Sequence, residues 1–354
     1  MEPTTLDWSL GSRAARLADW DTALDIGRRV AGAGPRVELP ARAAMRDQLA
    51  AMVAQAEGAV TGFTGLEVSG FSSRAWVMGR GDWIRQNIQG LQRLLEPLAD
   101  RLLERRAPSG VARKALGAQT GALLGYVSRR VLGQFDVFLP VDDDGLIYFV
   151  GPNLVEVELR YHLRTDDFRL WVAIHEVTHR VQFSSAPWLR THLRSMVDAY
   201  LDTVSLDAGE LRRQLQNAIE GLHRGDLRGP GGILLLLSPE QRVVFERMQA
   251  MMSLLEGHAS FVMDEVARDL VADLPRLKRA LSHRRQVAGA ERTLQRAIGF
   301  DQKVQQYDRG ERFVRHVVER IGMSGFNLVW GSSDSLPSSV EVADPARWIA
   351  RVTG

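Results

Sequence analysis

The chain of 354 residues contains no cysteine, and this absence excludes several kinds of chemistry. Disulfides, thiolate metal sites, iron–sulfur clusters and cysteine nucleophiles are all impossible. Lysine is scarce as well, because only Lys114, Lys278 and Lys303 occur and nearly all positive charge comes from arginine. The 45 basic and 43 acidic residues leave a net charge of +2. Such a balance does not favour nucleic acid as a partner.

Long hydrophobic runs are also lacking. The longest unbroken aliphatic segment, residues 233–237, is far shorter than the roughly 20 residues that span a bilayer. The first 20 residues include Glu2 and Asp7 and form no continuous apolar stretch, so we expect no signal peptide. These features predict a cytoplasmic protein without a membrane span.

Helical patterns dominate what remains, and we expect a mainly α fold with a small β-hairpin or edge sheet. Residues 41–57 are rich in alanine, and residues 81–106 are expected to form one helix, or two that meet near Pro97. Gly117, Gly121 and Gly125 recur every fourth residue, which predicts close packing against the backbone of another helix. Further helices are expected at about 154–164, 167–184, 189–204, 207–223, 239–271, 275–284, 289–299 and 301–321.

One region indicates β-structure. In residues 137–150, two short apolar runs flank an Asp-Asp-Asp-Gly turn, which is typical of a hairpin. The following Gly-Pro-Asn is expected to end the strand, with Asn153 as the N-cap of the next helix.

The most specific motif is His175-Glu176-Val177-Thr178-His179. Asp166 and Asp167 provide a helix-start signal, and no helix breaker follows before the motif ends. Histidines four residues apart project from the same helical face, so His175 and His179 can bind one metal ion. Glu176 lies about 100° around the helix, beside the metal, where it can take a proton from water.

A catalytic zinc also needs a third protein ligand. Gln182 and Ser185 stand where the long metzincin signature requires glycine and histidine, which excludes that class. Glu256 is the favoured candidate, because it interrupts a mainly apolar face of the expected helix 239–271, and Gly257 beside it could relieve crowding. His258 is the rival, although it lies roughly 200° from Glu256 on the same helix.

The segments HEVTHRVQF and LLEGHASFVMD resemble the zincin-like metallopeptidase type 2 family, and the resemblance covers most of residues 110–352. It implies a helical catalytic core, with His175 and His179 as zinc ligands, Glu176 as the catalytic glutamate and Glu256 as the third ligand. We expect a catalytic region at 110–354 with an N-terminal helical region, 1–109, packed on it, or one continuous domain.

These observations predict a zinc-dependent hydrolase that acts on a peptide or protein with one zinc ion per chain. Tyr307, His258 and Arg180 are candidate oxyanion donors, and residues 146–150 are a candidate edge strand for pairing with substrate. An alternative is a catalytically retired zincin scaffold that binds or assembles partners, although the intact motif argues against it. Nucleic-acid binding through Arg129–Arg130 or Arg284–Arg285 is disfavoured by the near-neutral charge.

Overall fold

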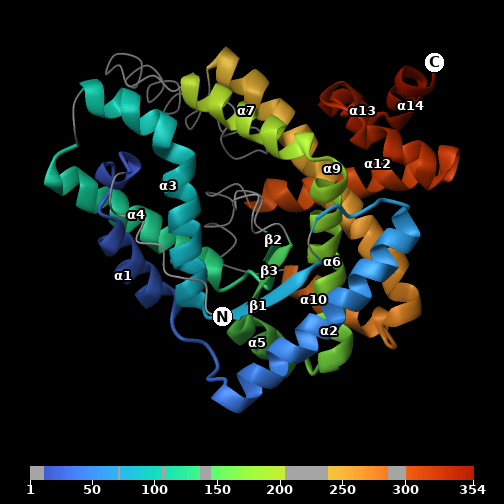
Figure 1. Cartoon of the computed structure of the whole chain (residues 1–354), viewed down its shortest axis with the longest axis horizontal. Helices are drawn as coiled ribbons and strands as arrows, with labels where there is room; N and C mark the ends of the chain where they lie inside the picture. Colours follow the sequence, from blue (N-terminus) through green and yellow to red (C-terminus); the bar gives the residue numbers. More distant parts are fainter. Residues whose placement is uncertain (1–11, 71, 106–107, 136–144, 204–237, 286–299) are drawn as a thin grey trace. The chain divides into compact units, whose positions relative to one another are not determined.

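The computed structural model describes residues 12–70, 72–105, 108–135, 145–203, 238–285 and 300–354, and the mainly α fold class is confirmed (Figure 1). The chain divides into two compact units. Unit 1 comprises residues 1–50 and 74–163, and unit 2 comprises residues 51–73 and 164–354. Helix α2 (Leu39–Thr64) begins in unit 1 and ends in unit 2. The expected division at residue 109 stays a prediction.

Unit 1 contains a helical layer in which two helices approach unusually closely. Its helices are η1 (Ala14–Arg16), α1 (Trp20–Ala31), α3 (Arg80–Arg105), α4 (Gly110–Ser128) and α5 (Gly151–Tyr161), and Pro97 lies inside the single helix α3. A Cβ atom on Gly117 would lie 2.2 Å from the carbonyl oxygen of Asp19, and one on Gly121 would lie 2.2 Å from that of Ala23. The glycines of α4 therefore admit the backbone of α1, as the sequence predicted.

The sheet of unit 1 has three strands in the order β1–β3–β2. Strand β1 (Arg74–Met78) runs parallel to β3 (Leu146–Val150), and β2 (Gly133–Phe135) runs antiparallel to β3. All five residues of β3 are buried. A core cluster that includes Ile84 of α3 and Ala23 of α1 packs against β3.

Two expectations for this region are wrong. Residues 146–150 form the central strand, whose two edges are already paired, so their backbone is not available to a substrate. Asn153 is not an N-cap, because α5 already begins at Gly151. Instead its buried amide accepts a hydrogen bond of 2.6 Å from Arg80 Nε and donates one of 2.7 Å to the Ser128 carbonyl. The expected first strand of the hairpin, 137–140, lies outside the described residues.

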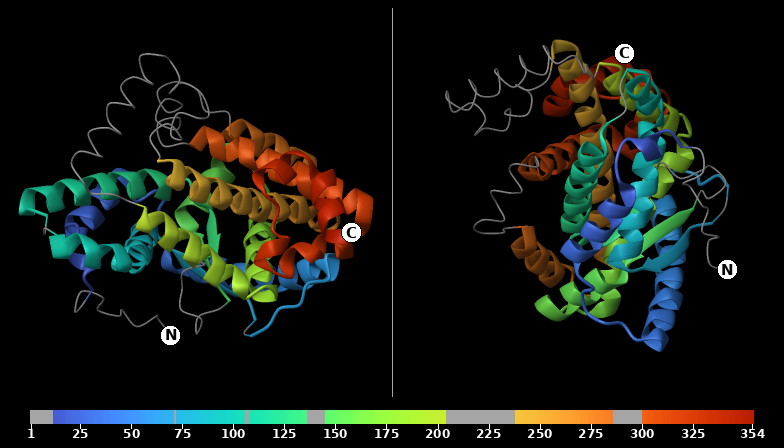
Figure 2. Two further views of the ribbon diagram at one scale, coloured as in Figure 1. Left: turned by 90° about the horizontal axis from the view of Figure 1, so that it is seen from above. Right: turned by 90° about the vertical axis from the view of Figure 1, so that its left-hand side faces the viewer.

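In the described residues of unit 2, every regular secondary-structure element is a helix, and loops such as residues 65–70 connect them. It contains α6 (Thr165–Ser185), α7 (Trp188–Asp202), α9 (Pro239–Leu270), α10 (Leu274–Arg285), α12 (Phe300–Phe326), η5 (Asn327–Trp330), η6 (Ser333–Ser335), α13 (Ser339–Ala343) and α14 (Pro345–Thr353). Helices α9 and α12 lie side by side (Figure 2). The expected helices at 207–223 and 289–299 lie outside the described residues.

Glycines allow the close contact between α9 and α12. A Cβ atom on Gly257 would lie 2.1 Å from the carbonyl carbon of Gly310, and one on Gly310 would lie 1.8 Å from the carbonyl oxygen of Ser253. Gly257 thus admits the backbone of a neighbouring helix, which is a different role from relieving crowding near a metal.

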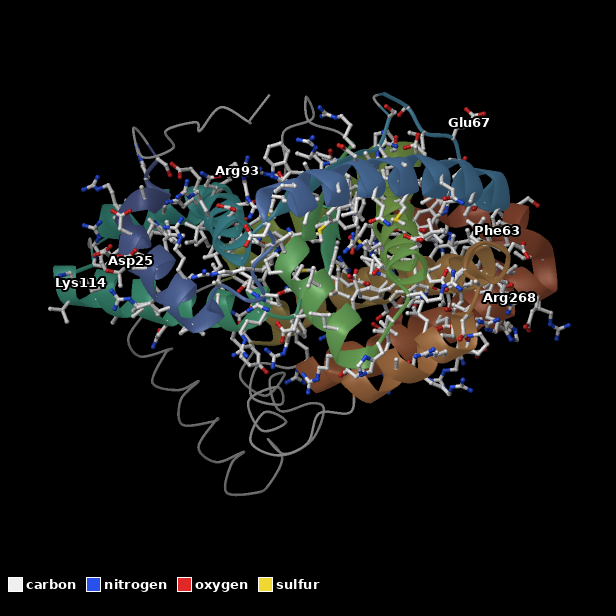
Figure 3. The ribbon with its side chains drawn as sticks, turned by 90° about the horizontal axis from the view of Figure 1, so that it is seen from below. Asp25, Phe63, Glu67, Arg93, Lys114 and Arg268 are labelled. Carbon is white, nitrogen blue, oxygen red and sulfur yellow. The ribbon has the colours of Figure 1, made fainter. Side chains whose placement is uncertain are left out.

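The end of α2 packs on α9 in the same unit. The ring of Phe63, labelled in Figure 3, lies 6.2 Å from that of Phe261, and the Arg315 guanidinium lies 5.1 Å above Phe261.

Among the helices that the structure describes, none combines the length and apolar character needed to cross a bilayer.

Candidate metal centre

Two helices carry the side chains of the site. Helix α6 holds His175 and His179 and buries most of its length, including Phe168 and Val172. Helix α9 holds Glu256 and begins with a capping box, in which Ser238 Oγ accepts from the Gln241 backbone N–H at 3.2 Å and Gln241 Oε1 accepts from Ser238 N–H at 2.9 Å. These reciprocal bonds satisfy two backbone donors at the helix start.

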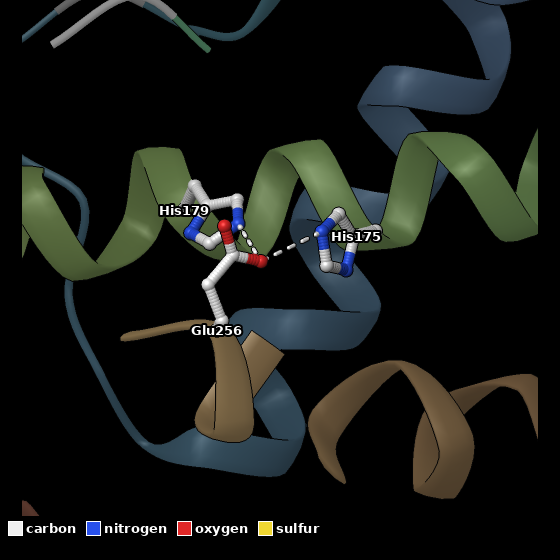
Figure 4. A group of neighbouring side chains, drawn as sticks. All are labelled: His175, His179 and Glu256. Carbon is white, nitrogen blue, oxygen red and sulfur yellow. Dashed lines mark ion pairs between the residues drawn. The ribbon is translucent and has the colours of Figure 1, made fainter. Parts of the chain in front are cut away.

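The structure brings His175, His179 and Glu256 together. Glu256 Oε2 lies 3.6 Å from His175 Nε2 and 3.6 Å from His179 Nε2 (Figure 4). The imidazole rings are nearly perpendicular, with centroids 4.8 Å apart. The side chains of His175, His179 and Glu256 are 25%, 15% and 15% exposed, so the site is recessed but reachable from solvent.

The spacing of these donor atoms suits a metal ion better than a direct hydrogen bond. A separation of 3.6 Å is too long for an ordinary hydrogen bond. Two ligands that each lie about 2.0–2.2 Å from a tetrahedral zinc are roughly 3.3–3.6 Å apart. Two imidazoles and one carboxylate also make a known donor set for catalytic zinc and leave a fourth position open. The residues present therefore fit zinc.

The charges of the site reinforce one another. Burial by itself would raise the pKa of Glu256, but the two histidines outweigh it and hold that pKa well below its usual value. Burial would lower the pKa of His179, but Glu256 and, less strongly, Glu176 raise it above 6.5. Without a metal, the site therefore favours a protonated His179 beside an ionised Glu256.

Glu176 lies beside this group without belonging to it. Its side chain is 7% exposed, and it follows His175 directly on α6. The group of three donors that lie within 4.8 Å of one another consists of His175, His179 and Glu256.

His258 points into the core instead of joining the three donors. It is fully buried, its ring is stacked on Phe326 at 5.1 Å, and the edge of Trp330 lies 5.2 Å away. Burial, and secondarily the charge of His179, lower the pKa of His258 to about 3, so the ring is neutral. Its Nδ1 lies 2.9 Å from Gln182 Nε2.

Arg180 and Tyr307 were the other candidate oxyanion donors. Arg180 is fully buried and donates from Nη1 to Glu57 Oε2 at 3.2 Å. The side chain of Tyr307 lies outside the described residues.

The remaining histidines do not belong to the group of three donors. His162 ends α5 in a left-handed conformation, and His192 and His316 lie on α7 and α12. The side chains of His223 and His283 lie outside the described residues.

Sequence reasoning missed Gln182, whose side chain touches the site. Its Oε1 lies 3.0 Å from His179 Nδ1. The available signal was its position three residues after His179, which places both side chains on the same helical face.

Comparison with known proteins extends the similarity to nearly the whole chain. Residues 18–349 match the zincin-like metallopeptidase family. A crystal structure from Chloroflexus aurantiacus, described as "a putative hydrolase with a novel fold", is 31% identical and superimposes with a TM-score of 0.72. The match covers 95% of this chain and 99% of the other. No curated protein matches the chain. The extent of the family match shows that the chain belongs to the zincin-like metallopeptidase family.

Proposed function

We propose that this protein is a zinc-dependent hydrolase, specifically a metallopeptidase, in which His175, His179 and Glu256 hold one zinc ion per chain. The observation that carries the proposal is the approach of Glu256 Oε2 to 3.6 Å from both imidazoles across 77 residues of sequence. Membership of a metallopeptidase family and likeness to a protein described as a hydrolase support the same reaction class.

The ligand set suits hydrolysis of a carbonyl compound. Two neutral imidazoles and one carboxylate carry a single negative charge, so a divalent cation in the site keeps a net positive charge. When bound, zinc polarises a substrate carbonyl and lowers the pKa of water. The side chain of His175 is 25% exposed, so solvent reaches this ligand of the proposed site.

Glu176 supplies the acid–base chemistry in this proposal. Its position one residue after His175, about 100° around α6, keeps its carboxylate out of the ligand set and beside it. The carboxylate accepts a proton from the attacking water and then donates it to the leaving nitrogen. Its burial limits exchange of that proton with solvent.

The substitution Glu176→Gln tests this role, because an amide cannot accept the proton. In a peptide-library cleavage assay of the zinc-loaded protein, we expect the rate to fall by at least about 100-fold. Elemental analysis should show that zinc is retained, since Glu176 is not a ligand.

Glu265→Gln is a matched control, because Glu265 is a carboxylate on α9 with 17% side-chain exposure and ion pairs to Arg268 and Arg315. That variant should cleave like the wild type. A wild-type protein that binds zinc but cleaves no peptide would instead support the alternative of a binding or assembly scaffold.

A further inference from the structure

We propose that Gln182 is a positioning residue for the metal centre: its amide fixes the proton of His179 on Nδ1 and ties the turn of α9 that carries Glu256 to α6. This inference rests on the proposed zinc site and adds a residue to it. The motif and the group of metal-binding donors do not include Gln182.

Three contacts surround the fully buried Gln182 side chain. Its Nε2 donates to the Leu255 carbonyl oxygen at 2.9 Å and lies 2.9 Å from His258 Nδ1, while its Oε1 lies 3.0 Å from His179 Nδ1. The two amide protons and the amide oxygen therefore each have a partner.

The Leu255 contact determines which way the amide faces. A backbone carbonyl can only accept a hydrogen bond, so the atom beside it must be the amide nitrogen. A flipped amide would place two oxygens against each other at Leu255. The orientation thus follows from the network of partners, which is how such assignments are made.

The orientation of the amide in turn determines the state of His179. Because Gln182 Oε1 can only accept, a hydrogen bond to it requires a proton on His179 Nδ1. In the neutral ring the lone pair is then on Nε2, the nitrogen that faces Glu256. Partners of this kind orient ligating histidines and raise their basicity in metal sites.

The same amide joins the two helices that supply ligands. Leu255 directly precedes Glu256 on α9, and Gln182 is one turn from His179 on α6. The amide also donates to His258, which is held between Phe326 and Trp330. Removal of these bonds should loosen both the orientation of His179 and the approach of Glu256. In contrast, His175 Nδ1 has no hydrogen-bond partner among the described residues, so Gln182 acts on one ligand of the pair.

The test compares Gln182→Met with Gln241→Met in the full-length protein. Gln241 is also a buried glutamine, 6% exposed, and it lies 15 residues before Glu256, about 22 Å along α9. Both substitutions remove a buried amide of unit 2. We expect only Gln182→Met to weaken zinc binding, by about 10- to 100-fold in a chelator competition assay.

A spectroscopic measurement separates positioning from a loss of stability and needs no metal. Long-range ¹H–¹⁵N spectra of the metal-free protein at alkaline pH should show His179 Nδ1 protonated in the wild type and in Gln241→Met. In Gln182→Met, Nδ1 should lose its proton. Gln182→Glu retains an acceptor for His179, and its buried carboxyl, when protonated, can still donate to the Leu255 carbonyl, so this variant should keep Nδ1 protonated even if the methionine variant does not fold.

A protonated Nδ1 in Gln182→Met would overturn the proposal, and so would an unprotonated Nδ1 in wild type or in Gln182→Glu. Equal zinc affinity of Gln182→Met and Gln241→Met would do the same. A wild-type protein that binds no zinc contradicts the proposed function instead, and the spectra of the metal-free protein still decide the role of Gln182.

Discussion

At the scale of single residues, the site is defined by one carboxylate oxygen that approaches two imidazoles. Glu256 is 15% exposed, and burial alone would favour its neutral form. The histidines hold the pKa of Glu256 well below its usual value, and Glu256 in turn raises the pKa of His179, so the metal-free His179 keeps its proton to a higher pH than a free histidine. A metal ion that replaces this proton retains the electrostatic attraction and satisfies all three donors at once.

Glu256→Ala should weaken zinc binding by more than about 100-fold, because loss of even an outer-shell partner costs 10- to 100-fold. Glu265→Ala on the same helix, with 17% exposure, should leave the zinc dissociation constant unchanged in the same chelator competition. His258→Ala should have a much smaller effect than Glu256→Ala, since His258 faces the core. The assignment of the third ligand is wrong if His258→Ala releases zinc and Glu256→Ala does not.

Zinc affinity should depend on pH through His179. Its pKa in the metal-free protein is raised above 6.5, so its proton persists to a higher pH than in an isolated histidine. Zinc must displace that proton, so affinity should fall as the pH drops through the raised pKa, by up to about tenfold per pH unit for each proton displaced. Calorimetry in buffers of different ionisation enthalpy should detect proton release on binding near neutral pH. Identical binding heats in all buffers would show that no proton is displaced.

At the scale of secondary-structure elements, the metal centre depends on how closely α9 can approach its neighbours. Gly257 lies directly after Glu256 and in contact with the backbone of α12 near Gly310. Real Cβ atoms do not approach a backbone carbon to 2.1 Å, so any side chain at 257 must displace one of the helices. The helix that carries Glu256 is thus held on one side by α6 and on the other by α12.

Gly257→Ala should destabilise the protein by about 1–3 kcal/mol, because overpacking forces backbone shifts. Gly58→Ala is the matched control, since Gly58 lies in α2 and a Cβ there would meet nothing within 4 Å. That variant should instead stabilise by about 0.5–1 kcal/mol through helix propensity. Urea unfolding curves measure both changes, and a Gly257→Ala midpoint at or above that of the wild type would contradict the packing.

Sequence patterns predicted most helices, a small sheet with a strand at 146–150, and the three donors, but not how the strands of the sheet pair. Helical periodicity and the spacing of His175 and His179 are local, so they can be found without knowing the fold. Strand β1 has only five residues and pairs in parallel with a strand more than 60 residues later, and no local pattern encodes that pairing. The central position of β3 was missed for the same reason.

The contacts of Gln182 within the site were also hidden from the sequence, because local patterns do not encode contacts between distant segments. Its position relative to His179 could be found on a helical wheel, but its partners Leu255 and His258 come from α9, which only tertiary packing brings close. Gly257 was likewise assigned a role near the metal, because Gly310 is distant in sequence. Glu256 could be chosen on a second helix because a lone carboxylate interrupts an apolar face, whereas the partners of Gln182 and Gly257 have no such signal and required the structure.

At the scale of the whole molecule, all three donors belong to unit 2, and the rest of that unit supports them. Helices α6 and α9 carry the three donors, and α12 and the segment after it pack around His258. The site is therefore contained in one compact unit of the chain. Binding of zinc to the folded state should stabilise that unit, because a ligand that binds only the native form shifts the unfolding equilibrium.

The most direct test of this account is the zinc content of the full-length protein after reconstitution at neutral pH and removal of free metal. Elemental analysis should find about one zinc per chain in the wild type, as a three-donor site with an open position requires. In the double variant His175→Ala/His179→Ala it should find close to none. A wild type without zinc, or a double variant that retains a full equivalent, would contradict the metal centre on which the proposed function depends.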